Sequence, residues 1–140
     1  MYHKVILVGN LGRDPEMRYT PSGTVVTSFS VATSDKWTGQ DGTLQERTIW
    51  WRVSVFGKTA EVCNEYLKKG RQVLVEGRIT ADPKTGNPRI WTGQDGQPRA
   101  SYEVTALTVK FLGPRVGESS APAATPAEAD LPLDEGEIPF

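Results

Sequence analysis

The clearest pattern in the chain is a strict alternation over residues 49–56, within a β-rich run that begins at Thr48. Side chains of a β-strand point alternately to its two faces, so this segment is predicted to be a strand with two different faces. One face carries Ile49, Trp51, Val53 and Val55. The other face carries Trp50, Arg52, Ser54 and Phe56. The first face is typical of a core or a subunit contact, and we expect Trp51 in one of these two places.

Four further segments predict strands, and one predicts a helix. Apolar or β-branched runs place strands at residues 5–8, 25–34, 72–80 and 102–112, the first of them buried and ended by Gly9. Residues 59–69 have the pattern of a helix, with Thr59 as its cap and Lys68 and Lys69 in its last turn before Gly70. Five strands with a helix before the fourth predict an all-β fold, a small closed barrel of the oligonucleotide-binding (OB) type.

A six-residue repeat predicts two β-hairpins. Trp-Thr-Gly-Gln-Asp-Gly occurs at residues 37–42 and again at 91–96. Each copy ends in Asp-Gly, which favours a two-residue hairpin turn. Each copy begins with a tryptophan, so two extended arms are expected to carry Trp37 and Trp91 in the same relation to the turn. A chance match of turn residues explains the repeat equally well, and the hairpin prediction holds either way.

The even-numbered face of residues 49–56 indicates a surface for nucleic acid. Two aromatic rings interleaved with an arginine and a serine make a poor core and a poor water-facing surface. They suit stacked bases beside phosphates, because every base has a π-face and cations hold the backbone. Lys58 follows at once, and Lys69, Arg71 and Arg78 lie shortly beyond. The alternative is a second apolar face covered by another layer, which the exposed positions expected for Trp37 and Trp91 disfavour.

Charge divides the chain into a basic body and an acidic tail. Residues 1–113 carry 15 Lys and Arg against 11 Asp and Glu, whereas residues 114–140 carry 1 against 6. Residues 114–133 are rich in Pro, Ala, Ser and Glu without a periodic pattern, which predicts a flexible linker. An aromatic residue at the end of such an acidic, flexible segment is best explained as a binding motif for another protein. The residues of this predicted tip are Asp134, Glu135, Glu137, Ile138, Pro139 and Phe140.

Other chemistry finds little support in the sequence. His3 is the one histidine, expected to be solvated, and Cys63 is expected to be a small core residue. We find no cluster with metal-ligand spacing, no phosphate-binding glycine loop and no nucleophile with a partner base. The sequence therefore predicts a protein that is not an enzyme and needs no metal or cofactor. A single cysteine and a short N-terminal apolar run favour a cytoplasmic protein without a membrane span.

Several segments together resemble the bacterial single-stranded DNA-binding protein family. The resemblance extends over about residues 1–113 and the last seven residues, and the segments that carry it follow one another in the same order as in the family. These segments are residues 4–19, 32–37, 50–58, 65–77 and the Ile-Pro-Phe end at 138–140.

The resemblance implies an OB-fold that assembles as a homotetramer and binds single-stranded DNA without sequence preference. The family's stacking aromatics correspond to Trp37, Trp50, Phe56 and Trp91. Its basic contacts correspond to Arg18, Arg52, Lys58 and Lys69. Its acidic tip docks replication, recombination and repair proteins. The chain departs from the family at Thr80-Ala81-Asp82, where a basic segment is usual, and an extra turn at residues 83–88 lengthens the arm that carries Trp91.

Two other classes of function remain open at this point. An RNA-binding or translational OB-fold protein would share the basic, aromatic barrel, although the Ile-Pro-Phe end favours a DNA-binding protein. A nuclease on the same scaffold is the third reading, supported by nothing beyond scattered acids. The domain organisation predicted in all cases is an OB domain at residues 1–113, a linker at 114–133 and a protein-interaction tip at 134–140.

Overall fold

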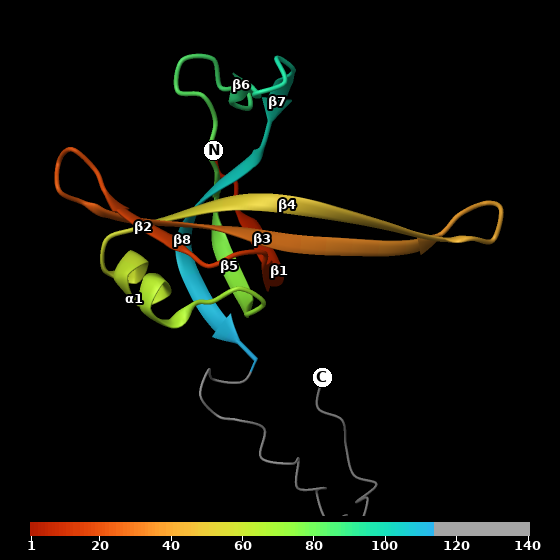
Figure 1. Ribbon diagram of the computed structural model, residues 1–140, viewed down its shortest axis with the longest axis horizontal. Coiled ribbons are helices and arrows are strands. Elements are labelled where there is room, and N and C mark those ends of the chain that lie inside the picture. Colours follow the sequence, from red (N-terminus) through yellow and green to blue (C-terminus); the bar gives the residue numbers. More distant parts are fainter. Residues whose placement is uncertain (114–140) are drawn as a thin grey trace, which may run out of the picture.

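The computed structural model describes residues 1–113 of the chain (Figure 1). The predicted linker and tip lie outside these described residues. The described part contains eight strands and one helix in the following order: β1 (Val5–Leu11), β2 (Glu16–Tyr19), β3 (Val25–Thr38), β4 (Leu44–Phe56), α1 (Lys58–Tyr66), β5 (Gln72–Ile79), β6 (Ile90–Thr92), β7 (Pro98–Ala100) and β8 (Tyr102–Leu112).

Five of the strands close into a barrel, which confirms the predicted OB-type fold. Neighbouring strands follow the order β1-β5-β8-β4-β3, and β1 pairs with β3 to complete the circuit. The closing pairs are Asn10 with Ala32 and Leu11 with Val31. β4 and β8 pair in parallel, with Trp51 opposite Tyr102. The predicted strands at 72–80 and 102–112 are thus confirmed within one residue, and α1 precedes the fourth barrel strand as expected.

The barrel interior is filled mainly by the inward faces of its strands. Val53 and Val55 of β4 are fully buried beside Val31, Val73 and Val75. These aliphatic residues make one contiguous cluster, and Leu67 and Cys63 close it from the α1 side. The alternation predicted for residues 49–56 is therefore confirmed, because Trp51, Val53 and Val55 face this cluster while the even positions face outward.

The first strand differs from the prediction in length and in burial. β1 does not end at Gly9 but continues to Leu11, because Asn10 and Leu11 are needed to close the barrel on β3. A side chain at Gly9 would collide with the carbonyl oxygen of Ala32, so glycine here permits close backbone approach. Ile6 and Val8 point outward and are exposed, so only one face of this apolar run is buried.

The helix is also shorter than predicted. α1 begins at Lys58 and ends at Tyr66, so Thr59 is not its cap and the two lysines at 68 and 69 lie beyond it. Gly57 takes the N-cap position with φ of 71°, and its carbonyl accepts from Ala60 N at 3.0 Å. The chain becomes extended at Leu67, whose buried side chain turns into the barrel instead of continuing the helix.

Both predicted hairpin arms are present, but their turns differ from the prediction. β3 and β4 extend together far beyond the barrel, and β6 and β7 form a smaller arm at one end of it (Figure 1). In the long arm, Gly39 N donates to Thr43 O and Gly42 N donates to Gly39 O. The loop therefore has three residues with Gly42 at a φ of 80°, not two. Gly93, Gly96 and Gln97 repeat this pattern, so the sequence repeat is also a repeat of turn geometry.

We expect Gly77→Ala to lower the free energy of unfolding by about 1–3 kcal/mol, as overpacking does in well-packed interiors. Gly77 lies at the irregularity in the β5–β8 pairing, where an added methyl group would collide with the backbone of Thr105 and Ala106. Urea denaturation measures the change. Arg78→Ala, one residue along and exposed, should stay within about 0.5 kcal/mol of the parent chain. Equal stability of the two variants would contradict the close approach at Gly77.

Candidate nucleic-acid interface

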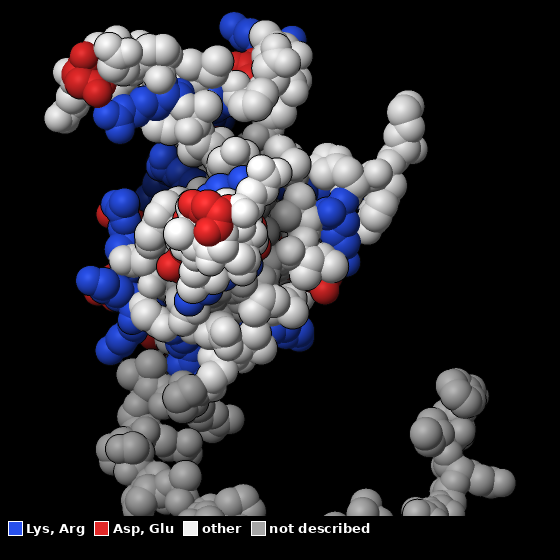
Figure 2. Space-filling view, turned by 90° about the vertical axis from the view of Figure 1, so that its right-hand side faces the viewer, with Lys and Arg blue, Asp and Glu red and all other residues white. Residues whose placement is uncertain are grey.

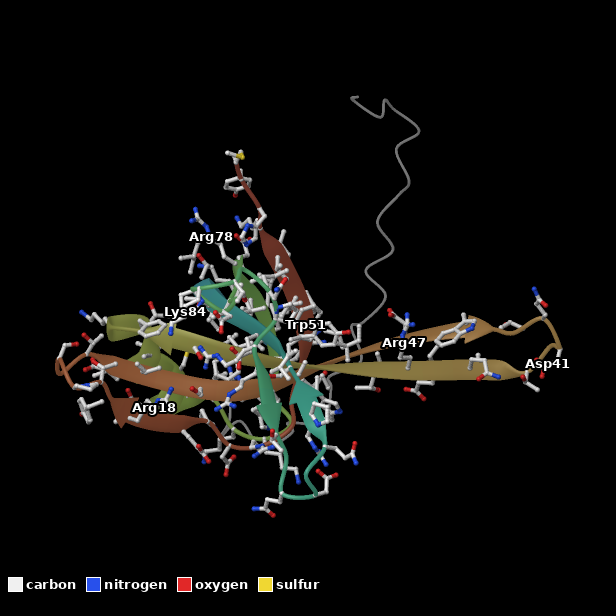
Figure 3. The ribbon with its side chains drawn as sticks, turned by 90° about the horizontal axis from the view of Figure 1, so that it is seen from above. Arg18, Asp41, Arg47, Trp51, Arg78 and Lys84 are labelled. Carbon is white, nitrogen blue, oxygen red and sulfur yellow. The ribbon has the colours of Figure 1, made fainter. Side chains whose placement is uncertain are left out.

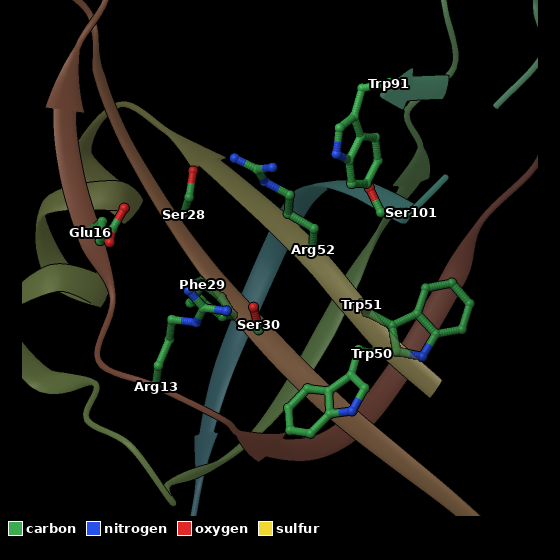
Figure 4. A pocket seen from close by; sticks show the side chains of 10 residues that line it. All are labelled: Arg13, Glu16, Ser28, Phe29, Ser30, Trp50, Trp51, Arg52, Trp91 and Ser101. Atoms are coloured by element: carbon green, nitrogen blue, oxygen red, sulfur yellow. The ribbon is translucent and has the colours of Figure 1, made fainter. Parts of the chain in front are cut away.

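A shallow hollow of about 270 Å³ lies on the outer face of β3 and β4 (Figure 4). It brings together three residues predicted from the sequence, namely Trp50, Arg52 and Trp91. The other residues that line it are Arg13, Glu16, Ser28, Phe29, Ser30, Trp51 and Ser101. We call this surface the platform. It combines three indole rings, two guanidinium groups, three hydroxyl groups and one carboxylate. The aromatic and cationic groups among them are those expected for contact with bases and phosphates.

Trp50 is held in place by the backbone beneath it. A β-carbon at Gly12 would overlap the six-membered ring of Trp50, so the indole rests directly on this glycine. Gly12 is itself fixed by a hydrogen bond from its N–H to Ser30 O at 3.1 Å. The absence of a side chain at position 12 thus lets the Trp50 ring pack flat against the backbone, while the other face of the ring stays accessible.

The platform continues along β4 toward Phe56. Arg18 of β2 pairs with Val26 of β3, which pairs with Phe56, and directly opposed residues share one face of a sheet. Arg18 therefore lies on the same face as Phe56, across Val26. The four predicted stacking residues all expose much of their rings, with exposed fractions of 54% for Trp50, 48% for Phe56, 44% for Trp37 and 41% for Trp91.

Trp37 lies apart from the platform, on the long arm. Trp37 is an even number of residues from Val31 along β3, so the two side chains point to the same face, and Val31 pairs with Trp51. Trp37 therefore lies on the face of the β3–β4 ribbon opposite to Trp50. The guanidinium carbon of Arg47 lies 5.4 Å from the centre of the Trp37 ring, within the range of a cation–π contact. Arg47 also approaches Asp35 at 3.8 Å (Figure 3 labels Arg47 on this arm).

Trp51 is partly buried and packs against the core cluster, which is one of its two predicted places, although it also lines the platform. Its Nε1 donates to Thr33 Oγ1 at 2.8 Å, and its ring lies 5.3 Å from that of Tyr102. Behind it is a second hollow of about 570 Å³, walled by Ile79, Tyr102 and Pro88. The extra turn at residues 83–88 therefore forms one side of this apolar hollow, beside the small β6–β7 arm. Trp91 of β6 still lines the platform.

The remaining predicted cations are spread around the barrel. Lys58 is the first residue of α1 and is exposed. Lys69 and Arg71 line a third hollow at the β1–β5 corner, next to Asn10. Arg78 lies near the opposite end of β5 (Figure 3). Figure 2 shows Lys and Arg side chains gathered along the left edge of the barrel, with Asp and Glu side chains among them.

Two minor expectations are confirmed. His3 is exposed, as expected, and its Nε2 also accepts a hydrogen bond from Ile79 N at 3.2 Å, which anchors the start of the chain to the end of β5. Cys63 is buried as expected, and burial raises the pKa of its thiol to about 11. Among residues 1–113, no group of three or more His, Cys, Asp and Glu side chains could hold a metal ion. Within the same residues, no helix is long and apolar enough to cross a membrane.

Sequence reasoning missed Arg13, Arg47 and the serines of the platform. Ser28 and Ser30 share the outer face with Arg52, since Ser30 is opposite Arg52 and Ser28 opposite Ser54. The even positions of β3 could have revealed them once the register with β4 was known. Arg13 carries no such signal, because it lies in the loop after β1 and reaches the platform only when the barrel closes.

The closed five-stranded barrel and its aromatic, basic outer face define a protein of the oligonucleotide-binding class. Residues 2–112 match the single-strand binding protein family, and the chain belongs to that family. The family match spans nearly all the described residues.

Known relatives agree with this assignment. Two proteins of Neisseria meningitidis, from serogroups A and B, are named single-stranded DNA-binding protein and are each 46% identical over 113 residues. That alignment covers 81% of this chain and 61% of theirs, so the chain matches less than two thirds of their length. A Wolinella succinogenes protein of the same name is 36% identical over an alignment of 169 residues that covers 100% of both chains.

Solved structures share the fold. A Plasmodium falciparum SSB in complex with ssDNA superposes with a TM-score of 0.66 at 27% identity, covering 81% of this chain and 97% of that one. A deletion mutant of the Thermus aquaticus single-stranded DNA binding protein gives a TM-score of 0.62 at 32% identity, covering 79% of this chain and 50% of that one.

Proposed function

We propose that this protein binds single-stranded DNA without sequence preference and has no catalytic step of its own. The observation that carries the proposal is the outer face of β4, where Trp50 and Phe56 flank Arg52 in one exposed row. A strand laid along this row would stack its bases on the rings and place its phosphates beside Arg52, Arg18 and Lys58. Stacking requires no particular base, which accounts for the lack of sequence preference.

The two arms would extend this contact. Trp91 lines the platform from the small arm, so it is placed to stack on a base next to Trp50. Trp37 would take a base on the open face of its ring, because Arg47 covers the other face. Lys69 would hold the backbone past the platform. Arg78 lies apart from these residues, and the proposal does not depend on it.

An RNA-binding OB-fold protein is the alternative. The names of the Neisseria and Wolinella relatives, and the strand bound in the Plasmodium structure, favour DNA. Competition between DNA and RNA oligomers of equal length and matched sequence separates the two possibilities, and preferential capture of RNA would overturn the proposal.

We expect Trp50→Ala to weaken binding of oligo(dT) and oligo(dC) alike by about 1–3 kcal/mol, because one stacked base is lost. Fluorescence anisotropy with a labelled oligomer measures the affinity, and thermal unfolding shows whether the variant folds normally. Tyr2→Ala is the control, since Tyr2 is an exposed aromatic residue that does not line the platform. Normal affinity in a folded Trp50→Ala variant would exclude the platform as the binding surface.

We further propose that the chain assembles as a homotetramer. Exposed apolar side chains on the outer surface of the barrel support a subunit contact, in particular Ile6 and Val8 of β1 and Leu107 of β8. Burying such residues against another copy removes apolar area from water. We expect light scattering at micromolar concentration to give four times the mass of one chain, and Ile6→Asp to shift it toward smaller species. A stable wild-type monomer would refute this assembly.

The acidic tip is proposed to recruit replication, recombination and repair proteins in the cytoplasm, around the nucleoid. The support is in its sequence, where Ile138, Pro139 and Phe140 follow three acids. Phe140 offers a ring and a carboxylate at one point, and Asp134, Glu135 and Glu137 would steer the approach to a basic rim on the partner.

We expect deletion of Phe140 to abolish capture of such partners while leaving DNA affinity intact or slightly raised. Loss of one ring removes the anchor of the docking contact, whereas the acids that compete with DNA remain. A pull-down of replication and repair proteins beside a DNA titration on the same variant measures both effects. Deletion of Ala121 in the linker is the control and should change neither. If the variant without Phe140 still captures the same partners, the partner-binding residues lie elsewhere in the chain. If it loses DNA binding, the tip belongs to the DNA-binding site.

A further inference from the structure

The face of the long arm that carries Trp37 has a single pair of opposite charges. In the arm, odd-numbered residues of β3 pair with odd-numbered residues of β4, so they share this face. Among the odd positions of residues 33–37 and 45–49, Arg47 is the one cation and Asp35 the one acid. The two strands therefore give this face no net charge, although the body of the protein is basic.

Asp35, Trp37 and Arg47 are neighbours on this face. Asp35 is directly opposite Arg47, and Trp37 lies two positions along β3 from Asp35, so Arg47 and Trp37 are diagonal neighbours. Arg47 Nη2 lies 3.8 Å from Asp35 Oδ2, and the guanidinium carbon lies 5.4 Å from the centre of the Trp37 ring. The same guanidinium group therefore contacts a carboxylate that balances its charge and a ring that it covers.

The barrel does not support the Trp37 ring. From Thr33 onward, β3 pairs with no strand of the described chain other than β4, and Figure 3 shows Arg47 on the arm, well away from the barrel. Trp50, by contrast, packs on Gly12 of the barrel. Within the described chain, Trp37 is the one tryptophan with a cation over its ring. Arg47 thus provides on the arm the packing that the barrel provides for Trp50.

A guanidinium group is suited to holding an aromatic ring. It is planar and stacks on the face of a ring, which the compact ammonium group of lysine does not do in the same way. A ring held in one orientation has less freedom to lose when a base stacks on its other face. Because Asp35 balances the charge of Arg47, this arginine is also a weaker attractor for a phosphate than an unpaired one.

We propose that Arg47 is a positioning residue for Trp37, which covers one face of the indole and presents the other to a base without itself contacting the strand. This inference rests on the proposed function, since the base belongs to the same DNA strand. The long arm thereby acts as a preformed stacking unit apart from the platform, although it has no core of its own.

The test is a double-mutant cycle in the full chain with Trp37→Ala, Arg47→Gln and the two combined. Affinity is measured against salt concentration by fluorescence anisotropy, with oligo(dT) of about 16 nucleotides, the upper end of the range bound by one OB-fold. Thermal unfolding shows whether each variant folds normally. Fluorine NMR of protein labelled with 5-fluorotryptophan reports on the Trp37 ring, whose signal is the one missing from Trp37→Ala.

We expect Arg47→Gln to weaken binding about threefold, as the loss of an exposed cation–π contact would. The salt slope should stay as in the parent chain, whereas a lost phosphate contact would make it shallower by about 0.7. The combined variant should bind like Trp37→Ala alone, because Arg47 acts through the ring. Arg47→Lys should resemble Arg47→Gln, because lysine keeps the charge but not the planar group.

Lys36→Gln is the matched control. Lys36 precedes Trp37 on the same arm but lies on the other face, opposite Glu46, so the variant removes the same charge from the same arm. Any loss of affinity that it causes should add to that of Trp37→Ala. In the free protein, Arg47→Gln should shift and sharpen the Trp37 fluorine signal and leave those of the other three tryptophans in place, whereas Lys36→Gln should change none of them.

Additive losses from Trp37→Ala and Arg47→Gln would overturn the proposal. So would a shallower salt slope in Arg47→Gln with full affinity in Arg47→Lys, since that result would make Arg47 a phosphate contact. A folded Trp37→Ala variant that binds like the parent chain would instead refute the stacking assigned to Trp37. A wild-type chain that does not bind the oligomer would refute the proposed function itself, so these failures are distinguishable.

Discussion

Closure of the barrel through the last two residues of β1 is the constraint on which the rest of the structure depends. Asn10 and Leu11 pair with β3 on one side, while Asn10 pairs with the start of β5 on the other. This brings Gly12 beneath Trp50 and places Lys69 and Arg71 beside the same loop. An open sheet with the same strands would not bring the hollow lined by Lys69 and Arg71 next to the stacking surface. Glycine at position 9 permits the approach, because any side chain there would meet the carbonyl of Ala32.

The inner and outer faces of β4 have separate physical tasks. Val53 and Val55 contribute to stability by leaving water, at about 25 cal/mol for each Å² of apolar surface buried. Trp50 and Phe56 keep much of their rings in water, so their stacking capacity remains available to a ligand. The long arm carries the same two faces beyond the barrel, where the inner face no longer has a core to cover. Trp37 and Arg47 emerge on that inner face, which explains why they lie apart from the platform although they belong to the same ribbon.

Much of the fold could be read from local patterns. The alternation over residues 49–56 was correctly assigned to an inner and an outer face, and two further strands agree within one residue. The errors arose where tertiary contacts override local signals. Thr59 looks like a cap, but Gly57 alone can take the positive φ of the turn after β4. Gly9 looks like the end of a strand, but the partner strand requires its small size. The turn type of the repeat depends on the pairing of Gly39 with Thr43, which a dipeptide preference does not specify.

The sequence by itself determined which chemistry the protein carries: exposed aromatics interleaved with arginine, a basic body, an acidic end and a barrel-forming order of elements. These properties follow from residue type and from the two-residue period of a strand, both of which are local. Only the tertiary structure decided which of these groups act together. It joined Arg13 and Trp91 to Trp50, set Trp37 on the other face of the ribbon, and left Arg71 with a buried, unpaired donor within residues 1–113. The physical reason is that such groupings come from pairings between residues far apart in the chain, and no local pattern encodes their register.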